Sequence, residues 1–310
     1  MNTPHDREAT MGALLRALPY IRLYRGRVFV LKLGGEAVAD AESLRKVVEQ
    51  VGVLSELGVR LVVVHGGGPQ TTALAERMGL TTRMVGGRRI TTPETLEVAI
   101  MTMNGTVNTA VLAACRAAGI AAVGVSGVDA GLVRARRRPP VETIVDGKPT
   151  VVDYGEVGDV MSVDGPALER LLDDGFVPVV SPLSADEAGN VLNVNADTVA
   201  SAIACALGAE KLIFLTAVPG ILEDRADPGS LISYIDLPGL LLLEGRGALD
   251  GGMLPKVNAA RGAILGGVKR VHIVGFRQPL SLLVEVFTNE GAGTLVVRDR
   301  AELSPGEQAP

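Results

Sequence analysis

Short apolar runs alternate with glycine-rich turns and longer stretches of helical period from residue 28 onward. Continuous apolar runs predict buried strands at Val28–Lys32, Arg60–His65, Ile120–Val125, Pro178–Ser181, Leu212–Thr216 and Val271–Val274. The stretches between them predict helices, of which residues 93–118 form the longest. Strands without polar alternation are covered on both faces, as in parallel sheets. The pattern therefore predicts an α/β fold, a mostly parallel open sheet sandwiched between helices.

Two segments depart from this pattern. Residues 9–25 precede the first strand and carry apolar residues at helical spacing, which predicts an amphipathic helix kinked or interrupted at Pro19. Val141–Val145 and Thr150–Val152 flank the turn pair Asp146-Gly147, which predicts an antiparallel hairpin. We expect an N-terminal extension over 1–25, a substrate lobe over 26–194 and a nucleotide lobe over 195–310.

Composition and charge narrow the function. The chain has 310 residues, and its net charge of −5 argues against a general nucleic-acid binder. The charged N-terminus is unlike a secretory signal, and by sequence no apolar run approaches the roughly 20 residues of a membrane span, so we expect no membrane and a cytoplasmic location. Cys115 and Cys205 lie in Ala-rich helical stretches, which favours reduced thiols over a disulfide or a metal site.

Glycine-rich turns follow the first two predicted strands. One reads Lys32-Leu33-Gly34-Gly35, and the other reads His65-Gly66-Gly67-Gly68-Pro69-Gln70. Bare backbone amides before a helix can approach an anion closely, and the helix N-terminus favours negative charge. Tight packing turns look the same, but two on adjacent strands, one with a lysine, favour an anion site. The P-loop and dinucleotide fingerprints are absent, so a nucleotide site must be of another type.

Three further stretches carry candidate polar residues. Asn193, Asn195 and Asp197 alternate just before a predicted helix, which is more than one helix cap requires. Lys256 falls in the first turn of another helix, where the dipole offers a cation nothing unless it meets an anion. Arg89, in the stretch Gly87-Arg88-Arg89-Ile90-Thr91, could bind a carboxylate through its guanidinium group.

Together these stretches resemble the amino acid kinase family, and within it the acetylglutamate kinases of the arginine-sensitive type. The resemblance runs from about Arg16 to Val297. It rests on the order and spacing of Lys32–Gly35, His65–Gln70, Arg89–Thr91, Ser126–Asp129, Asn193–Asp197, Gly251–Lys256 and Glu290–Thr294.

The resemblance implies ATP-dependent phosphorylation of the side-chain carboxylate of N-acetyl-L-glutamate, the second step of arginine biosynthesis, with Mg²⁺ arriving on the nucleotide. It implies that Lys32 and Lys256 stabilise the transferring phosphoryl group and that Asp197 holds both lysines. The remaining assignments are substrate binding by Gly67, Gly68, Arg89, Asn193 and Asn195, phosphate binding by Gly34 and Gly35, and nucleotide binding by Thr216, Val218, Gly220 and Met253. A carboxylate is already a nucleophile at neutral pH, so such a site needs no general base.

Two positions depart from the family pattern. Ala217 stands where the family usually has an aspartate after the first strand of the nucleotide lobe, and the stretch 273–277 lacks the family's Asp-Gly-Arg. Ala217 is also the one feature that favours a non-catalytic regulatory protein of the same fold. A kinase of carrier-linked aminoadipate in lysine biosynthesis is the nearest enzymatic alternative, and an NAD-dependent oxidoreductase is a more distant one.

The N-terminal helix resembles the extension of arginine-inhibited members, which interlaces dimers into a hexamer. The resemblance therefore implies a homo-hexamer, or otherwise a homodimer, with arginine as inhibitor near Glu290 and Gly291. A helix that merely covers its own domain is the alternative. Binding of a PII-type regulator is left open by the sequence.

Overall fold

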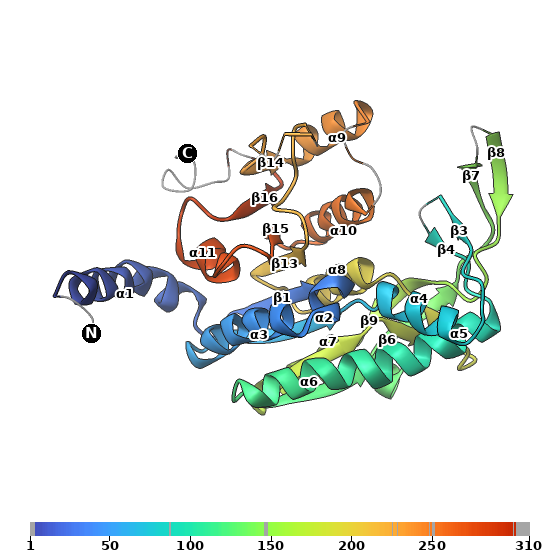
Figure 1. The fold of residues 1–310 in the computed structure, drawn as a ribbon, viewed down its shortest axis with the longest axis horizontal. Helices are drawn as coiled ribbons and strands as arrows, with labels where there is room; N and C mark the ends of the chain where they lie inside the picture. The colour runs from blue at the N-terminus through green and yellow to red at the C-terminus, as the bar shows by residue number, and fades with distance from the viewer. Residues whose placement is uncertain are drawn as a thin grey trace.

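The computed structural model describes residues 4–86, 88–145, 148–224, 226–227, 229–247, 249, 252–299 and 301. Several predicted features lie outside these ranges: Gly87, the turn pair Asp146-Gly147 and Gly251. Figure 1 shows the arrangement of the helices and strands around a central sheet.

The central sheet has eight strands in the order β14-β16-β15-β13-β1-β2-β10-β5. Every neighbouring pair is parallel except β15 and β16, which are antiparallel. The strands are β1 (Val28–Leu33), β2 (Arg60–His65), β5 (Ala122–Ser126), β10 (Val177–Ser181), β13 (Lys211–Thr216), β14 (Tyr234–Asp236), β15 (Arg270–Gly275) and β16 (Gly293–Val297). The predicted α/β fold with a mostly parallel sheet is confirmed.

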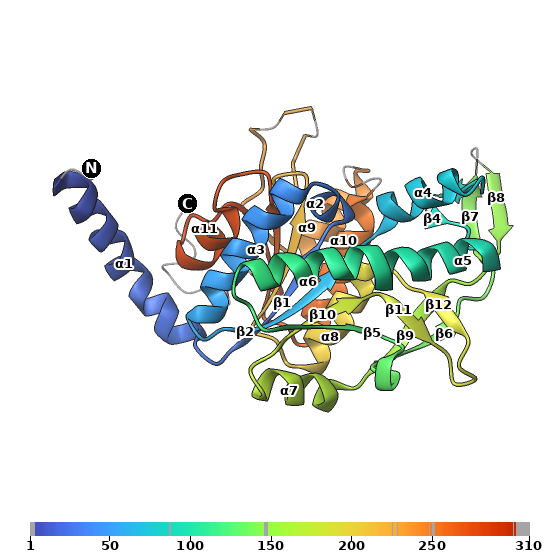
Figure 2. The same ribbon diagram turned by 60° about the horizontal axis from the view of Figure 1, so that its bottom comes forward.

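Alternate side chains of β1 enter two hydrophobic cores, one on each face of the sheet. Phe29, Leu31 and Leu33 pack on one face with α3 (Ala41–Glu56), α6 (Asn108–Ala117) and α11 (Ser281–Phe287). Val30 points to the other face, where α7 (Gly165–Asp173), α8 (Ala196–Ala206) and α10 (Met253–Leu265) cover it. Figure 2 shows helices on both sides of the sheet. Burial on both faces explains why the strands lack polar alternation.

Smaller sheets project from one end of the molecule. A four-stranded sheet has the order β12-β11-β6-β9, and two antiparallel hairpins pair β3 with β4 and β7 with β8. The bounds are β3 (Met84–Val85), β4 (Arg88–Arg89), β6 (Val133–Arg137), β7 (Val141–Val145), β8 (Lys148–Val152), β9 (Gly158–Val163), β11 (Leu183–Ala185) and β12 (Val191–Asn193). The predicted hairpin is confirmed, and Tyr154 joins it to β3 in a small apolar cluster.

The helix predicted for residues 93–118 contains an irregular middle. It comprises α5 (Pro93–Ile100), a π-helix at Met101–Val107 and α6. By length and composition the segment Pro93–Ala117 could cross a membrane, contrary to our expectation that no segment would; 44% of its most apolar window is buried. Core helices pass the same test, and Val98, Val107 and Val111 face the protein interior here.

Helix α1 (Pro4–Tyr24) extends away from the body of the molecule, as both views show. We expected the helix to be kinked or interrupted at Pro19. The helix is not interrupted there, because it continues through Pro19 to Tyr24. Its C-terminal end approaches α11, whereas Leu14 and Leu15 are exposed. A helix with unburied apolar residues gains little from its own chain, so packing against a further surface would stabilise it.

The remaining elements are short. They are α2 (Gly35–Ala39), α4 (Gly68–Arg77), α9 (Leu237–Gly245) and a 3₁₀-helix at Asp129–Gly131. Helix α2 follows β1 at once, and α4 follows β2 in the same way. Asp40 separates α2 from α3, and its carboxylate caps α3 by accepting from the Ser43 amide.

Candidate active site

A cavity of about 510 Å³ lies where the carboxyl ends of β1 and β2 meet α8 and α10. Ligand sites in open parallel sheets occur at this edge, so the location agrees with the general rule. Eight of the predicted site residues line it: Lys32, Gly35, Gly67, Gly68, Arg89, Asn193, Asn195 and Asp197. The structure therefore brings together residues separated by up to 165 positions in sequence.

Asp197 lies between two lysines at the centre of the site. Its Oδ1 is 2.6 Å from the Nζ of Lys32, and its Oδ2 is 3.5 Å from the Nζ of Lys256. Lys32 comes from β1, Asp197 from the first turn of α8 and Lys256 from the first turn of α10. Both Lys32 and Asp197 are buried, so the carboxylate fixes the two ammonium groups in a site with little water.

In this cluster of Lys32, Asp197 and Lys256, burial disfavours the charged forms of Asp197 and Lys256, whereas the opposite charges nearby favour them. Burial alone would raise the pKa of the Asp197 carboxyl, but Lys32 and Lys256 hold it below its usual value. Burial, together with repulsion from Lys32, lowers the pKa of the Lys256 ammonium, and Asp197 partly opposes that change. Two cations share one carboxylate, which leaves the cluster with a net positive charge and a capacity to attract an anion.

The backbone amides of the two glycine turns differ in whether they are free to bind a ligand. Gly35 and Gly68 are the first residues of α2 and α4, and first-turn amides have no acceptor within their own helix. The Gly34 amide instead donates to the Leu215 carbonyl at 3.1 Å. The phosphate-binding role of Gly34 and Gly35 stays a prediction, and of the two amides the Gly34 amide is the one already paired within the protein. A Cβ at Gly35 would lie only 2.7 Å from Pro69 Cδ.

The guanidinium of Arg89 is buried in part and only partly satisfied. Its Nη2 donates to the Gly68 carbonyl at 2.9 Å and to the Thr72 hydroxyl at 2.6 Å. Its Nη1 is buried and has no hydrogen-bond partner among the described residues. A buried guanidinium nitrogen without an acceptor is costly, so a carboxylate entering the cavity would be bound strongly there.

Asn193 and Asn195 line the same cavity but differ in what their amides do. Asn195 is the N-cap of α8, and its Oδ1 accepts from the backbone amides of Asp197 and Thr198. One of the three alternating polar residues is thus explained by helix capping. Asn193 Nδ2 donates to the Thr91 hydroxyl at 3.3 Å.

The four residues predicted to bind nucleotide lie apart from the lining of this cavity. Thr216 ends β13, Val218 is exposed and Met253 begins α10. Gly220 packs closely on Thr294, since a Cβ there would lie 2.6 Å from the Thr294 hydroxyl. Ala217 is half-buried against the core beside α11.

The cavity has lining residues that sequence reasoning missed. They include Thr71, Met84, Arg88, Met103, Arg138, Tyr154, Val157 and Asn258. Met103 belongs to the π-helix and lies beneath the glycine turn, 3.1 Å from where a Cβ of Gly67 would be. π-Helical turns are frequent at functional sites, but their position is not readable from an apolar helical period.

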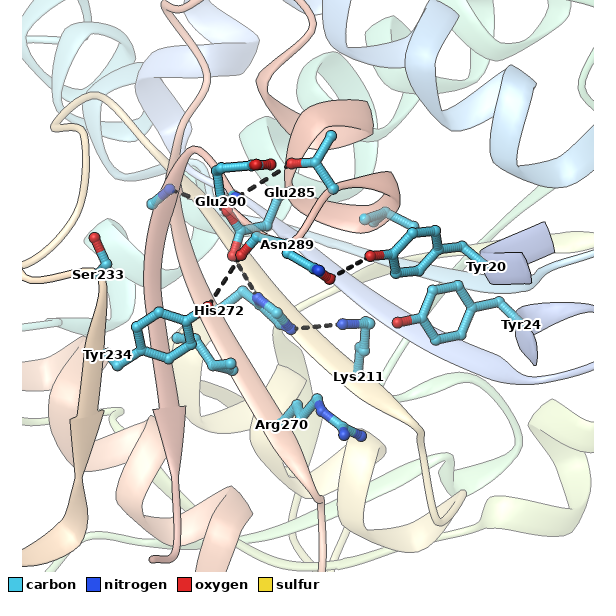
Figure 3. Close-up of a pocket in the computed structure, with 15 residues that line it drawn as sticks. Tyr20, Tyr24, Lys211, Ser233, Tyr234, Arg270, His272, Glu285, Asn289 and Glu290 are labelled. Carbon is cyan, nitrogen blue, oxygen red and sulfur yellow. Dashed lines mark hydrogen bonds and ion pairs between the residues drawn. The ribbon is translucent and has the colours of Figure 1, made fainter. Parts of the chain in front are cut away.

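A second, smaller pocket of about 50 Å³ lies between α1, α11 and the strands β13 and β15 (Figure 3). Tyr20 of α1 donates its hydroxyl to the Asn289 side chain, and the Tyr234 hydroxyl donates to the Asn289 carbonyl at 3.0 Å. The predicted residues Glu290 and Gly291 line this pocket. The structure thus places the end of the N-terminal helix beside them.

A buried chain of polar side chains forms the floor of this second pocket. Lys211 Nζ is 3.0 Å from His272 Nε2, and His272 Nδ1 is 2.5 Å from Glu285 Oε1 (Figure 3). Burial, followed by the Lys211 charge, lowers the pKa of His272 to about 4 despite Glu285. The neutral ring therefore donates from Nδ1 to Glu285 and accepts from Lys211 at Nε2.

Glu285 also receives two backbone donors, from the amides of Ala292 at 2.6 Å and Gly293 at 3.0 Å. Burial alone would raise the pKa of its carboxyl, but His272, the Ala292 amide and Lys211 lower it. Lys211, His272 and Glu285 were not predicted from the sequence. A lysine and a histidine inside otherwise apolar strands were the only available signals.

Comparison with known proteins agrees with this geometry. The sequence profile of the amino acid kinase family matches residues 27–275. The chain belongs to the amino acid kinase family. Among curated relatives, the acetylglutamate kinase of Myxococcus xanthus (strain DK1622) is 47% identical over 297 residues, covering 95% of this chain and 96% of that protein.

Solved structures show the same amino acid kinase fold. N-acetylglutamate synthase from Neisseria gonorrhoeae, complexed with coenzyme A and N-acetyl-glutamate, matches with a TM-score of 0.79 and 30% identity over 93% of this chain. The same synthase complexed with coenzyme A and L-arginine gives a TM-score of 0.78 at 28% identity and 93% coverage. The chain spans 63% of the first synthase chain and 65% of the second.

Proposed function

We propose that this protein uses ATP to phosphorylate the side-chain carboxylate of N-acetyl-L-glutamate, as its acetylglutamate kinase relatives do by name. The observation that carries the proposal is the Lys32–Asp197–Lys256 cluster at the edge of the cavity, with its distances of 2.6 and 3.5 Å. A relative that is 47% identical over nearly the whole chain supports the same activity. The reaction is a step of arginine biosynthesis.

The chemical step depends on neutralising negative charge. A carboxylate attacking the terminal phosphate of ATP brings several negative oxygens together, so the barrier falls when fixed cations lie beside the transferring phosphoryl group. Lys32 and Lys256 supply the cations, and Asp197 keeps both in place without moving during the reaction. The amides of Gly35 and Gly68 contribute hydrogen bonds from helix N-termini.

No proton needs to be removed from the nucleophile, because a glutamate side chain is ionised at neutral pH. The titratable group nearest the glycine turn agrees with this. His65 is fully buried, and burial lowers its pKa to about 4, so it stays neutral. Its Nε2 lies 3.1 Å from Asn108 Nδ2, which makes it an acceptor in the packing beneath the turn and not a proton acceptor for substrate.

Substrate selection depends on Arg89 and the cavity around it. The buried Nη1 of Arg89, which lacks a partner among the described residues, binds the α-carboxylate that remains after the side-chain carboxylate is presented to ATP. Asn193 lies across the same cavity and orients the acetylamino group. Asn195 contributes mainly through the cap that fixes the position of Asp197.

ATP occupies the side of the cavity formed by residues 195–310, with residues 26–194 binding the amino acid. Thr216, Val218, Gly220 and Met253 belong to residues 195–310 but lie outside the lining of the cavity, so in this proposal they contact a part of the nucleotide that extends beyond it. Among the described residues, no cluster of three or more His, Cys, Asp or Glu side chains could ligate a metal. In this proposal Mg²⁺ enters on the nucleotide, held by phosphates and water.

The second pocket binds arginine as a feedback inhibitor in this proposal. Its lining combines the carboxylates of Glu285 and Glu290 with the cations Lys211 and Arg270, which complements an amino acid whose side chain is also charged. Gly291 has φ of +64°, so the loop bends sharply beside Glu285. The related synthase from Neisseria gonorrhoeae has been crystallised with L-arginine, which supports this assignment.

Helix α1 joins dimers into a homo-hexamer. Its exposed Leu14 and Leu15 need a surface to cover them, and its last residues Tyr20 and Tyr24 line the second pocket. Contacts through α1 would thereby connect assembly with arginine binding. We further propose a cytoplasmic location and keep binding of a PII-type regulator as an open prediction.

The chemical product tests the proposed activity. Purified protein incubated with magnesium ATP and N-acetyl-L-glutamate should give an acyl phosphate, detectable by trapping with hydroxylamine as the hydroxamate. Formation of the hydroxamate only when both substrates are present supports the proposal. ADP released without hydroxamate would show hydrolysis of ATP and would contradict it.

A further inference from the structure

The side chain of Thr72 contacts the guanidinium of Arg89 and the backbone of the glycine turn at the same time. Thr72 lies in α4, four residues after Gly68. Its Oγ1 accepts from Arg89 Nη2 at 2.6 Å and donates to the Gly68 carbonyl at 3.1 Å. Arg89 Nη2 reaches the same carbonyl at 2.9 Å. The three groups therefore form a closed hydrogen-bonded ring.

This ring joins elements that are separate in the chain. Arg89 lies on β4 of a two-stranded hairpin, whereas Gly68 and Thr72 lie in the first turns of α4. A two-stranded hairpin fixes its own side chains weakly, and an arginine side chain loses much rotamer entropy on ordering. A charge-assisted bond to Thr72 reduces the freedom of the guanidinium before any ligand binds.

The ring occupies only one of the two terminal nitrogens of the Arg89 guanidinium. Both described contacts of Arg89 use Nη2. Nη1 is buried and lacks a partner among the described residues, while Arg89 lines the cavity. Without the Thr72 hydroxyl, the guanidinium could rotate and direct Nη1 toward other acceptors.

We propose that Thr72 is a positioning residue, which orients Arg89 so that Nη1 binds the α-carboxylate of the substrate. The inference rests on the proposed function for the identity of that carboxylate. The new element is that one hydroxyl, that of Thr72, fixes the position of the Arg89 guanidinium relative to the turn at Gly68. Thr72 itself need not touch the substrate.

The test compares Thr72→Val, which removes the hydroxyl with little change of shape, with Thr72→Ser, which retains it. Binding of N-acetyl-L-glutamate is measured by calorimetry without nucleotide, and steady-state kinetics gives KM and kcat. Thr72→Val should weaken acetylglutamate binding by about tenfold, the effect of roughly one charge-assisted hydrogen bond. Thr72→Ser should restore wild-type affinity, and KM for ATP should stay unchanged in both.

A substrate analogue separates positioning from general damage. N-acetyl-4-aminobutyrate keeps the reacting carboxylate and lacks the α-carboxylate, so Thr72→Val should not change its affinity or its kcat/KM. In an Arg89→Met background, Thr72→Val should have no further effect, because Thr72 acts through Arg89. Thr102→Val is a matched control, since the Thr102 hydroxyl donates to the Val98 carbonyl at 2.7 Å in the same i to i−4 pattern.

The outcomes distinguish this inference from the proposed function. Equal losses for acetylglutamate and for the analogue, no rescue by Thr72→Ser, or a tenfold loss in Thr102→Val would each overturn the role of Thr72. Suppose that the wild type binds acetylglutamate, that Thr72→Val weakens this binding as predicted, and that no ADP forms. This result would refute the proposed reaction and leave the positioning role intact. Wild-type protein that does not bind acetylglutamate would refute both.

Discussion

The Lys32 ammonium lies 2.6 Å from one oxygen of the Asp197 carboxylate, and both side chains are almost inaccessible to solvent. They come from β1 and α8, which pack together on one face of the central sheet. The second oxygen of Asp197 faces Lys256. A single carboxylate thus sets the separation of two cations that belong to distant parts of the chain.

Replacing this carboxylate should impair the chemical step. Asp197→Asn removes the charge that holds the lysines, so their repulsion should separate them, and kcat should fall about 100-fold. Steady-state kinetics with saturating ATP measures the change. Asp186→Asn is a suitable control, because Asp186 is bonded only within its own loop, and its kcat should match wild type. A kcat for Asp197→Asn within threefold of wild type would show that the cluster is not catalytic.

The charge of Lys256 should appear in the pH–rate profile. Burial and the Lys32 charge lower the pKa of Lys256 from the ordinary lysine value. Since the charged form is the active one, kcat should decline on the alkaline side at a lower pH than an ordinary lysine would cause. Lys256→Arg keeps the charge at every accessible pH, so its profile should lack this alkaline decline even if its maximum is lower. An identical alkaline decline in both proteins would assign it to another group.

Two buried histidines should make the fold sensitive to acid. The pKa values of His65 and His272 are lowered to about 4, against an unfolded value of 6.5. Between these values the unfolded chain binds protons that the native state does not, so stability falls as pH decreases from 6.5 toward 4. At pH 5 the loss is about 2 kcal/mol for each histidine.

Urea unfolding at pH 7 and pH 5 measures this loss in the free energy of unfolding. His272→Gln should show about half of the wild-type pH dependence attributed to the two histidines. A variant with the full pH dependence would mean that His272 is not neutral in the native state. The comparison uses the difference between the two pH values, so a constant loss of stability from the substitution does not affect it.

Arginine should inhibit through the second pocket. Glu290→Gln removes an exposed carboxylate from the lining of the second pocket, and Glu290 does not line the larger cavity. We expect the arginine concentration for half-inhibition to rise about tenfold, the effect of one charged contact, with kcat unchanged in the absence of arginine. Inhibition curves of the wild type and the variant measure the shift. Overlapping curves would place the inhibitor elsewhere.

Removal of most of α1 should alter assembly and leave the reaction intact. A protein that begins at residue 19 lacks the exposed Leu14 and Leu15 but keeps Tyr20 and Tyr24. Sedimentation should detect a hexamer for the full chain and a dimer for the truncated one, with similar kcat. A hexamer that persists after truncation would show that other surfaces hold the assembly together.

The fold was predictable because its strands are buried on both faces, which gives continuous apolar runs such as 61–64 in β2. Lys32 stood out because it lies at the end of a strand and precedes a glycine turn, whereas Asp197 and Lys256 stood out as charged residues in the first turns of helices. Only the resemblance to the family joined these three residues into one cluster. The π-helix was not, since its residues keep a helical apolar pattern while the backbone hydrogen bonds change. Gly34 also looked equivalent to Gly35, and only the pairing with Leu215 distinguishes them.

The contacts of the site depend on packing that sequence spacing does not contain. Thr72 meets Arg89 because the β3–β4 hairpin folds over the start of α4, and no local pattern encodes that approach. Tyr20 likewise bonds Asn289, 269 positions away in the sequence, because the end of α1 packs beside α11, and no local pattern encodes that contact. In contrast, Asn195 was recognisable as a possible helix cap, and it is one.

The release of ADP from magnesium ATP tests the central claim most directly, with N-acetyl-L-glutamate, L-glutamate and L-aspartate offered in parallel to the purified full chain. The account predicts rapid release with N-acetyl-L-glutamate alone, lost in Lys32→Met because that ammonium stabilises the transferring phosphoryl group. Absence of ADP with N-acetyl-L-glutamate, or equal rates with all three amino acids, would contradict it.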